Sequence, residues 1–434
     1  MNKVLVLAPR FPAINQPWID TYLEQLLISG FDVAIFSANT DGGPYHAKVD
    51  RLRLREKIVD FSLDRKTMIK QILAALAFRS PVSFILSVGA AWRLSADFAR
   101  SGSSRLLSFL KLLHFGIARQ RFHGVSVIHG HEEIAAYEFL HLARLLDIPM
   151  VVTFHGLPPA GVGQLSAAKR ALLYGYASSV LVNTEFSKRQ VVGVGCAPSK
   201  VNILPQGLPL EDFPFAARGR PDPQTPVRLL TVGRFHRDKG QGYALIALAR
   251  LLKSGVRAHW HFVGVGPDKA RLEKLAGQLG LREHIVFREG LAPAELLALY
   301  HQSDIFVLPS IDNRHGRHVE TQGVVLQEAQ ASGCIPIGSR VGGIPECLND
   351  RRDALLVQQK SSRAIAAAVT YLLDEVADWS AYRSAGRRNV EQRFSARVVG
   401  EKMKAVLDGA ISRGVRCSGD DDVGVEEGTR PAQP

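Results

Sequence analysis

The sequence has few cysteines and no long hydrophobic run, and each absence excludes a class of protein. Its four cysteines stand far apart, with no C-x-x-C pair and no histidine at ligand spacing, which excludes a disulfide scaffold and a zinc ribbon. No apolar run reaches the roughly 18 residues that a membrane-spanning helix needs. The opening MNKVLVLAPRFP lacks the features of a secretory signal, so we expect a cytoplasmic chain.

Acidic residues are scarce in part of the first half. None occurs between Asp97 and Glu132, although that stretch carries several arginines, and the whole chain has a formal net charge of +13. A surface of this kind favours an anionic partner. Nucleic acid and an anionic membrane leaflet are the two candidates that charge alone leaves open.

Short apolar runs alternate with helical stretches along the chain, as in strands buried on both faces of a parallel sheet. We expect strands in the first half at residues 3–9, 31–38, 125–131, 149–156 and 179–184. The pattern then restarts, with strands at 227–233, 258–264, 284–290, 304–310, 334–340 and 354–358. The sequence therefore predicts an α/β protein with two doubly wound domains that bind a ligand in the cleft between them.

The composition divides the chain into five parts. A segment dense in proline, glycine and arginine reads as a linker, and the end of the chain has no apolar periodicity. We expect a first domain at 1–209, a linker at 210–226, a second domain at 227–385, C-terminal helices at 386–411 and a disordered tail at 412–434.

Glycine and basic residues distinguish the loops that follow the strands. The first loop, LAPRFPAINQPW, has no glycine, which disfavours a dinucleotide-binding turn, and the G-x-G at 264–266 is equally typical of a tight turn. Arg234 and Lys239 follow the first strand of the second half, in VGRFHRDKG. Two cations at the mouth of such a loop suit a diphosphate, and a solvated basic loop is the alternative. We expect both side chains to be exposed when no ligand is bound.

The segment HVETQGVVLQEAQASGCIPIGSRVGGIPE carries two glutamates. Glu320 and Glu328 flank Gly323, where we expect a helix to begin that ends at Gly333. The first turn of a helix offers N–H groups to an anion, and carboxylates accept hydrogen bonds from sugar and ribose hydroxyls. The alternative is a pair of solvent-facing glutamates.

These motifs together resemble the signature of the family-4 glycosyltransferases of GT-B fold. The resemblance lies in Arg234 with Lys239, in the Glu320-x7-Glu328 pair, and in GGIPE at 342–346. The TFHG, VNTEFSKRQ and ILPQGLPLEDF segments are similar to further motifs of that family, in the same order. RFPAINQPWIDTYLEQLLISG and IHGHEEIAA resemble its bacterial exopolysaccharide subgroup, which builds colanic acid and amylovoran. Asn15–Gln16–Pro17 depart from the Ser-Glu-Thr string that is frequent in that subgroup.

The resemblance implies that the domain at 1–209 binds the acceptor, that the domain at 227–385 binds the nucleotide-sugar donor, and that the helices at 386–411 pack back on the first domain. It also implies a role for each candidate residue. Glu328 would hold the ribose of a UDP- or GDP-type sugar donor, Arg234 and Lys239 would bind its diphosphate, and Glu320 would contact the donor sugar. His155 would face the reaction centre, although a packed strand-end histidine is the alternative reading. The anion site would be completed by backbone N–H groups of Gly323, Val324 and Val325.

The resemblance also implies a retaining hexosyltransferase that needs no cofactor and no metal. The one D-x-D string, Asp420–Asp422, falls in the predicted tail. A nucleotide-sugar 2-epimerase of the same fold and a non-catalytic nucleotide-sugar-binding module are the alternatives. The basic run at 313–318 favours an acidic sugar or acceptor.

The acceptor implied by the resemblance is a lipid-linked saccharide at the inner face of the cytoplasmic membrane. The expected partner surface is therefore an anionic membrane and not nucleic acid. Residues 104–121 predict a helix with one apolar face and cations elsewhere, which suits either a membrane interface or a core. Its apolar face holds Leu106, Leu110, Leu113 and Ile117, and its cations include Arg105, Lys111, Arg119 and Arg121.

Overall fold

The computed structural model describes residues 1–8, 10–13, 17–39, 46–78, 81–157, 164–313 and 319–414, without the side chains of 76–87. Four features predicted from the sequence lie outside these ranges. They are Asn15–Gln16, the basic run from residue 314 to 318, Cys417, and the tail beyond residue 414 with Asp420–Asp422.

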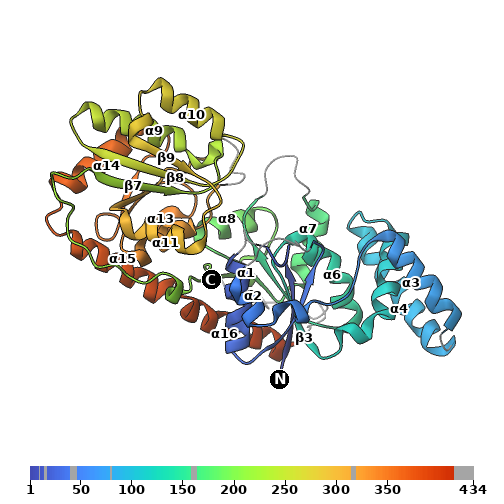
Figure 1. The fold of residues 1–434 in the computed structure, drawn as a ribbon. Helices are drawn as coiled ribbons and strands as arrows, with labels where there is room; N and C mark the ends of the chain where they lie inside the picture. Colours follow the sequence, from blue (N-terminus) through green and yellow to red (C-terminus); the bar gives the residue numbers. More distant parts are fainter. Residues whose placement is uncertain are drawn as a thin grey trace, which may run out of the picture.

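The first half of the chain forms a parallel six-stranded sheet in the order β2-β1-β3-β4-β5-β6 (Figure 1). The strands are β1 (Lys3–Ala8), β2 (Asp32–Ser37), β3 (Val125–Gly130), β4 (Met150–Phe154), β5 (Ser179–Val182) and β6 (Val201–Ile203). The five predicted strands are confirmed. β6 was not predicted because it has only three residues, two of them exposed. Helices α1 (Pro17–Ile28), α6 (Glu133–Leu146), α7 (Ala167–Tyr176) and α8 (Glu185–Gly193) connect the strands.

The second half repeats this architecture in a sheet of order β12-β11-β10-β7-β8-β9. All six predicted strands are present: β7 (Val227–Val232), β8 (Ala258–Val263), β9 (Ile285–Arg288), β10 (Ile305–Leu308), β11 (Ile335–Ser339) and β12 (Leu355–Val357). The helices are α9 (Gln241–Lys253), α10 (Lys269–Gln278), α11 (Pro293–Gln302), α12 (Val324–Ser332), α13 (Ile344–Cys347) and α14 (Ser362–Asp374). The fold is therefore the predicted α/β pair of doubly wound sheets.

A helical group lies between β2 and β3 and projects from the first sheet (Figure 1). It contains α3 (Arg65–Phe78), α4 (Pro81–Arg100) and α5 (Arg105–Ile117), whereas α2 (Ala47–Arg51) lies beside α1 and joins its apolar cluster. The segment predicted to face either membrane or core, now α5, packs against α3, α4 and α6. Leu113 is buried, Leu110 and Ile117 join the same apolar cluster, and Leu106 is exposed. The apolar face of this helix is therefore mainly a core face, and the membrane reading of that face is wrong.

Two cations of the α5 segment form ion pairs within the protein. Lys111 forms an ion pair with Glu138, and Arg121 pairs with Asp60 at 2.9 Å. No helix in the part of the chain that the structure describes is long and apolar enough to cross a membrane.

The last helices return to the first sheet. α15 (Trp379–Arg393) lies against α12, and α16 (Ala396–Arg413) packs on the first sheet and on α1. Val399, Met403 and Leu407 of α16 join one apolar cluster with residues of β1 and α1. The tail was predicted to start at residue 412, but the helix continues to Arg413.

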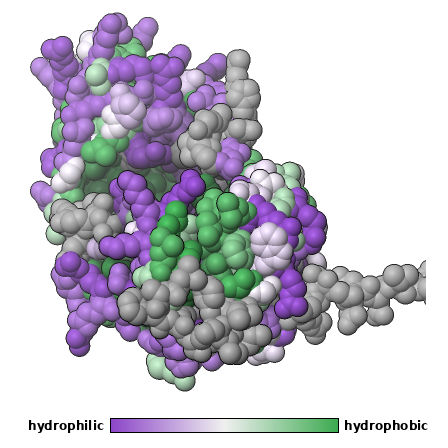
Figure 2. Space-filling model, turned by 90° about the vertical axis from the view of Figure 1, so that its right-hand side faces the viewer, coloured by the Kyte–Doolittle hydropathy of each residue, from purple (hydrophilic) through white to green (hydrophobic). Residues whose placement is uncertain are grey.

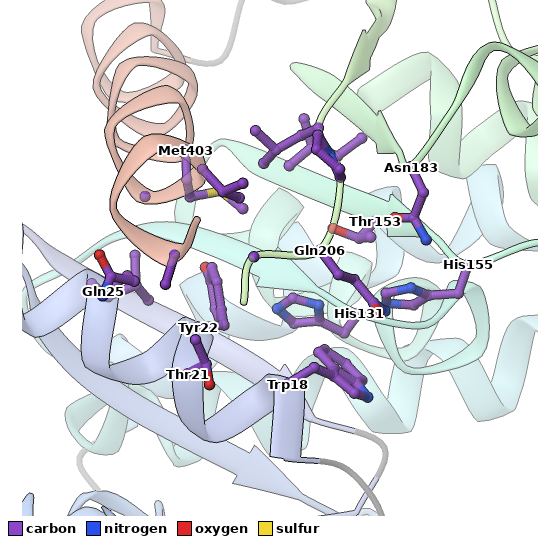
Figure 3. A pocket seen from close by; sticks show the side chains of 18 residues that line it. Trp18, Thr21, Tyr22, Gln25, His131, Thr153, His155, Asn183, Gln206 and Met403 are labelled. Atoms are coloured by element: carbon purple, nitrogen blue, oxygen red, sulfur yellow. The ribbon is translucent and has the colours of Figure 1, made fainter. Parts of the chain in front are cut away.

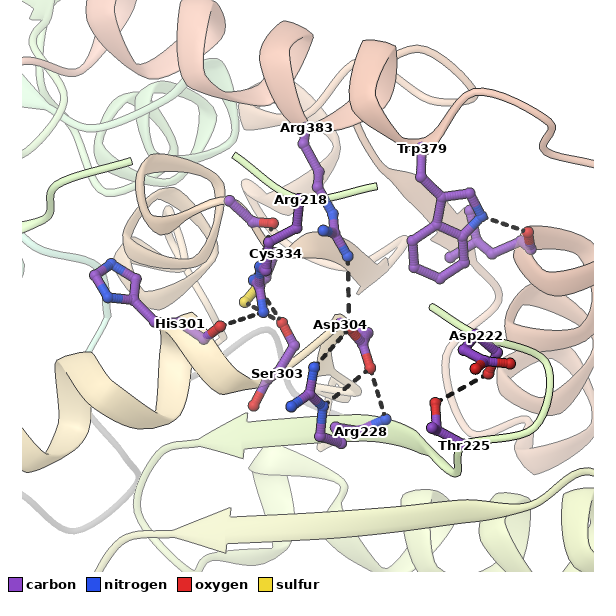
Figure 4. A network of polar contacts seen from close by, with 12 residues as sticks. Arg218, Asp222, Thr225, Arg228, His301, Ser303, Asp304, Cys334, Trp379 and Arg383 are labelled. Carbon is purple, nitrogen blue, oxygen red and sulfur yellow. Dashed lines mark hydrogen bonds and ion pairs between the residues drawn. The ribbon is translucent and has the colours of Figure 1, made fainter. Parts of the chain in front are cut away.

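The segment between the two sheets is tied to the second one by a buried polar network (Figure 4). The Arg218 guanidinium donates hydrogen bonds to the carbonyl oxygens of Ser303 at 2.8 Å and Gly333 at 3.3 Å. Arg383 of α15 is buried 3.6 Å from Asp304, which precedes β10, and burial lowers the pKa of its guanidinium to about 10. The segment therefore leads into the second domain as a bonded part of it.

Candidate active site

A cleft of about 310 Å³ lies between the carboxyl ends of the two sheets. Residues from both halves line it, which is the expected ligand position for two doubly wound domains. Among the predicted site residues, His155, Glu320, Gly323 and Val324 line this cleft. The remaining lining residues are Trp18, His131, Glu132, Asn183, Gln206, Thr321 and Gln322.

Two glycines hold the loop that carries Glu320. Gly342 has φ +57°, and a Cβ there would lie 2.0 Å from the carbonyl oxygen of Glu320. A Cβ on Gly343 would lie 2.0 Å from the carbonyl oxygen of Thr321, and the Gly343 N–H donates to the Glu320 carbonyl at 2.9 Å. The two glycines of the GGIPE run therefore allow close contact with the backbone of Glu320 and Thr321, and this contact fixes the position of Glu320.

Lys239 and Glu320 form an ion pair in the structure. Their Nζ and Oε2 atoms are 2.5 Å apart, and both side chains are about one fifth exposed. The sequence predicts an exposed Lys239, and this prediction is wrong because the partly buried Glu320 carboxylate attracts the cation. The loop position is set by Gly240, whose Cβ would lie 1.9 Å from the carbonyl oxygen of Pro309.

Arg234 lies in the same loop and is exposed, as expected. It is not among the residues that line the cleft. The G-x-G pair at 264–266 supports this loop, because a Cβ on either glycine would overlap the backbone of residues 233–235. The tight-turn reading of G-x-G is confirmed: the two glycines support the loop that carries the predicted diphosphate-binding cations.

The helix predicted to begin after Gly323 is α12, with Gly323 as N-cap at φ +77° and Gly333 as C-cap. Glu320 lies in the loop before α12, so the two glutamates do not share one helical face. The N–H groups of Val324 and Val325 belong to the first turn and have no acceptor within the helix.

Glu328 lies in the second turn of α12 and accepts a 2.7 Å hydrogen bond from the Tyr300 hydroxyl. Burial raises the pKa of Glu328, although the Tyr300 hydrogen bond opposes this effect. It is not among the residues that line the cleft. Because the side chain is partly buried and accepts a hydrogen bond from Tyr300, Glu328 is not simply a solvent-facing glutamate.

His155 follows β4 and lines the cleft, with its Nε2 atom buried and without a hydrogen-bond partner among the described residues. Burial lowers its pKa to about 4, so the imidazole is uncharged at neutral pH. Its ring lies 4.9 Å from that of Trp18. The side chain is therefore a neutral group at the cleft, and its Nε2 has no partner in the described part of the chain.

Hydrogen bonds across the cleft were not predicted from the sequence. The Thr184 hydroxyl donates to the Thr321 carbonyl at 2.9 Å, and Gln206 and Gln322 exchange two hydrogen bonds of 2.7 and 3.1 Å. Glu346 of the GGIPE run accepts from two backbone N–H groups at the start of α8. Pairs this distant in sequence show no local signal, although each lies in a segment with a family motif.

Two facing Rossmann-like sheets, with a carboxylate and a helix start at their common cleft, have the GT-B architecture found in glycosyltransferases. Comparisons with known proteins agree. Residues 19–212 match the model described as Glycosyltransferase Family 4, and residues 213–389 match the model described as Glycosyl transferases group 1. The chain therefore belongs to the family-4 glycosyltransferases, as its motifs predicted.

Individual relatives support this membership. The amylovoran biosynthesis glycosyltransferase AmsK of Erwinia amylovora is 25% identical over 94% of this chain and 99% of its own length. A glycogen synthase of Mycobacterium tuberculosis is 29% identical over 63% of this chain, and the match spans only 66% of that relative. The crystal structure of Anabaena Alr3699/HepE in complex with UDP has a TM-score of 0.69 and 13% identity, covering 94% of this chain and all of that one. This structure supports the fold.

Proposed function

We propose that the protein is a retaining, metal-independent glycosyltransferase. It would move a hexose from a nucleoside-diphosphate donor to a lipid-linked saccharide in the synthesis of a bacterial surface polysaccharide. The observation that carries the proposal is the cleft itself, which Glu320 and the start of α12 line together with His155; Lys239 does not line the cleft but pairs with Glu320. The exopolysaccharide relative AmsK and the UDP bound to the Anabaena structure support the substrate classes.

The donor would lie along α12. In this proposal Glu328 accepts hydrogen bonds from the ribose hydroxyls, and its bond from Tyr300 holds the carboxylate in place. The diphosphate meets the first-turn N–H groups of Val324 and Val325 together with Arg234 and Lys239. Since Lys239 pairs with Glu320 in the empty cleft, a bound diphosphate competes with that carboxylate for the cation.

The chemical step would occur on one face of the sugar. The bond between the anomeric carbon and the β-phosphate oxygen breaks, and the acceptor hydroxyl oxygen bonds to the same carbon. The hydroxyl proton passes to the departing phosphate oxygen. Charge that develops on the diphosphate is stabilised by Arg234, Lys239 and the helix start, and such fixed groups contribute about 3 kcal/mol each.

The product's configuration tests this proposal. The purified protein is incubated with UDP-, GDP- and ADP-hexoses and neutral glycoside acceptors, with EDTA present, and the product is examined by proton NMR. We expect one donor to give a glycoside with the donor's α configuration. Inversion of the anomeric configuration contradicts the retaining mechanism, and loss of activity in EDTA contradicts metal independence. Conversion of the donor sugar without an acceptor indicates an epimerase, and binding without turnover indicates a binding module.

Association with an anionic membrane is part of the proposal, on a surface formed by α3, α4 and the exposed start of α5 rather than by the buried residues of the α5 apolar face. Exposed apolar side chains gather on the projecting helical group: Ile69, Leu73, Trp92, Leu106 and Leu107. Figure 2, which faces this end of the molecule, shows a hydrophobic patch there. No acidic residue occurs from Arg65 to Ala96, whereas Arg65, Lys66, Lys70 and Arg93 are exposed. Exposed apolar residues beside exposed cations suit an anionic lipid surface, at about 1 kcal/mol per cation.

Vesicle sedimentation tests this surface. We expect the protein to sediment with phosphatidylglycerol vesicles at low salt and to be released by high salt. Changing Arg65, Lys66 and Lys70 to Gln should abolish sedimentation and preserve donor binding. The matched control neutralises Arg397, Lys402 and Lys404, three exposed cations of α16, and should sediment like the unchanged protein. Equal loss in both triple variants contradicts the assigned surface.

A further inference from the structure

Three cavities meet at the carboxyl ends of β3 and β4. They are the cleft already described, a cavity of about 220 Å³ beside α6, and a small one of about 60 Å³ between α1 and α16. His131 and His155 line all three. Figure 3 shows both rings beside Trp18. A group that enters the cleft on the side of the first sheet therefore meets these side chains.

His131 differs from its neighbour His129 in one respect. Both are buried, but the His129 nitrogens are engaged by the hydroxyls of Tyr22 and of Thr153, the latter at 2.8 Å. Neither ring nitrogen of His131 has a hydrogen-bond partner in the described part of the chain, and the side chain is only 3% exposed. Buried polar groups nearly always have a partner, so a ligand is the natural partner for this imidazole.

The surroundings of His131 select an uncharged ligand. Burial holds the pKa of His131 well below its ordinary value, and His129 and His155 lower it further. The neutral ring offers one N–H donor and one acceptor, as a pair of sugar hydroxyls requires. The Trp18 ring lies 5.2 Å away and presents an aromatic surface to the cleft, on which the apolar face of a sugar ring packs. The Glu132 carboxylate, which also lines the cleft, accepts hydrogen bonds from hydroxyl groups and repels anions.

We propose that Trp18 and His131 form the subsite for the terminal sugar of the acceptor, and that this sugar is a neutral hexose. The proposal rests on the proposed function and names the substrate class of its acceptor side. It departs from the acidic acceptor that the basic run at 313–318 favours. Uronic acids and phosphorylated sugars are excluded because no cation among the described residues lines the cleft on the side of His131.

The first test compares acceptors in the unchanged protein. The probes are p-nitrophenyl glucoside, galactoside and mannoside against p-nitrophenyl glucuronide, at up to about 50 mM, since single sugars bind weakly. We expect at least one neutral glycoside to accept sugar with a kcat/KM about tenfold or more above that of the glucuronide. A preference for the glucuronide overturns the proposal. Failure of all neutral probes to accept sugar also overturns it, provided that the donor is hydrolysed.

The second test uses variants of His131. His131→Phe keeps a ring against Trp18 and removes both nitrogens, so we expect an unchanged or higher unfolding temperature. Donor binding and donor hydrolysis by water should stay within about twofold, whereas the acceptor KM should rise about tenfold or more. His131→Gln restores a donor and an acceptor and should recover part of the loss. The matched control is His141→Phe, a buried imidazole stacked on Phe98 and outside the three cavities, which should leave the acceptor KM unchanged.

The outcomes separate this proposal from the proposed function. An acceptor KM that is unchanged in His131→Phe overturns the subsite, even if the enzyme transfers sugar. A loss of donor binding together with transfer shows a structural role for His131 and also overturns it. If the unchanged protein neither binds nor hydrolyses any nucleotide sugar, the proposed function itself fails.

Discussion

The ion pair between Lys239 and Glu320 predicts how two substitutions combine. In the proposed site Lys239 binds the donor diphosphate and Glu320 the donor sugar, yet the two side chains are in direct contact at 2.5 Å in the empty cleft. Lys239→Ala removes a cation and also leaves the Glu320 carboxylate unopposed close to a bound diphosphate. Glu320→Gln removes that negative charge.

The magnitude follows from these two effects. Loss of one fixed charged group costs about 10²-fold in rate, or about 2.7 kcal/mol, so each single variant should lose about that much in kcat/KM. Independent effects would give about 10⁴-fold in the double variant. Effects of substituting two side chains in contact couple by about 0.5–3 kcal/mol. In the double variant the Glu320 carboxylate no longer repels the diphosphate, which should restore about 1.4 kcal/mol of transition-state stabilisation. We therefore expect a loss of about 10³-fold in the double variant.

Steady-state kinetics of the two single variants and the double variant measure this coupling, with the donor varied at saturating acceptor. Unfolding temperatures confirm that all three are folded. A double variant that loses the full product of the single effects refutes direct coupling of the two side chains in the working site. Wild-type activity in Lys239→Ala refutes the assignment of Lys239.

Three further predictions follow from individual contacts. Gly343→Ala places a Cβ 2.0 Å from the Thr321 carbonyl oxygen and 2.7 Å from the Thr184 hydroxyl, so the Glu320 loop must shift. The rate of sugar transfer should fall about 10²-fold in steady-state kinetics, and an unaltered rate contradicts the proposed role of the glycine. Tyr300→Phe removes the hydrogen bond to Glu328 and should weaken nucleoside-diphosphate binding about tenfold in calorimetry, whereas unchanged affinity shows that this bond does not support the site. Burial lowers the pKa of His129 to about 3 and of His155 to about 4, while unfolded histidine binds a proton near pH 6.5. The two neutral histidines therefore contribute fully to the free energy of unfolding above pH 6.5, and each contribution falls by about 2 kcal/mol by pH 5 because the unfolded chain binds protons. Burial raises the pKa of Asp20 to about 7, so this residue stabilises the fold as the pH falls and partly offsets the loss. Scanning calorimetry should still show a lower unfolding temperature at pH 5 than at pH 7. No such decrease is expected if these histidines are protonated in the folded state.

The two sheets were predictable from the sequence because buried parallel strands are continuous apolar runs. Eleven strands fall where runs such as 3–9 and 304–310 place them, and the glycines at both ends of α12 set its limits. The prediction for α5 was incomplete for a physical reason. Amphipathicity shows that one face of a helix is buried, but not whether protein or lipid covers it.

The site was predictable only as a set of residues. The candidates lie in loops that follow strands or in the first two turns of α12, where the motif pattern places them. The pairing of Lys239 with Glu320 spans 81 residues and has no signature in either segment. The difference between His129 and His131 depends on which hydroxyls reach each ring, and that depends on packing between α1 and the strands.

Titration calorimetry of free nucleoside diphosphates tests the central claim that α12 and the loop before it form the donor site. UDP and GDP are titrated into the unchanged protein, Glu328→Gln and Glu320→Gln. We predict that one nucleotide binds, that Glu328→Gln weakens it about tenfold or more, and that Glu320→Gln leaves it unchanged or tighter because Lys239 is released. Equal losses in the two variants, or no binding of either nucleotide to the unchanged protein, would contradict the account.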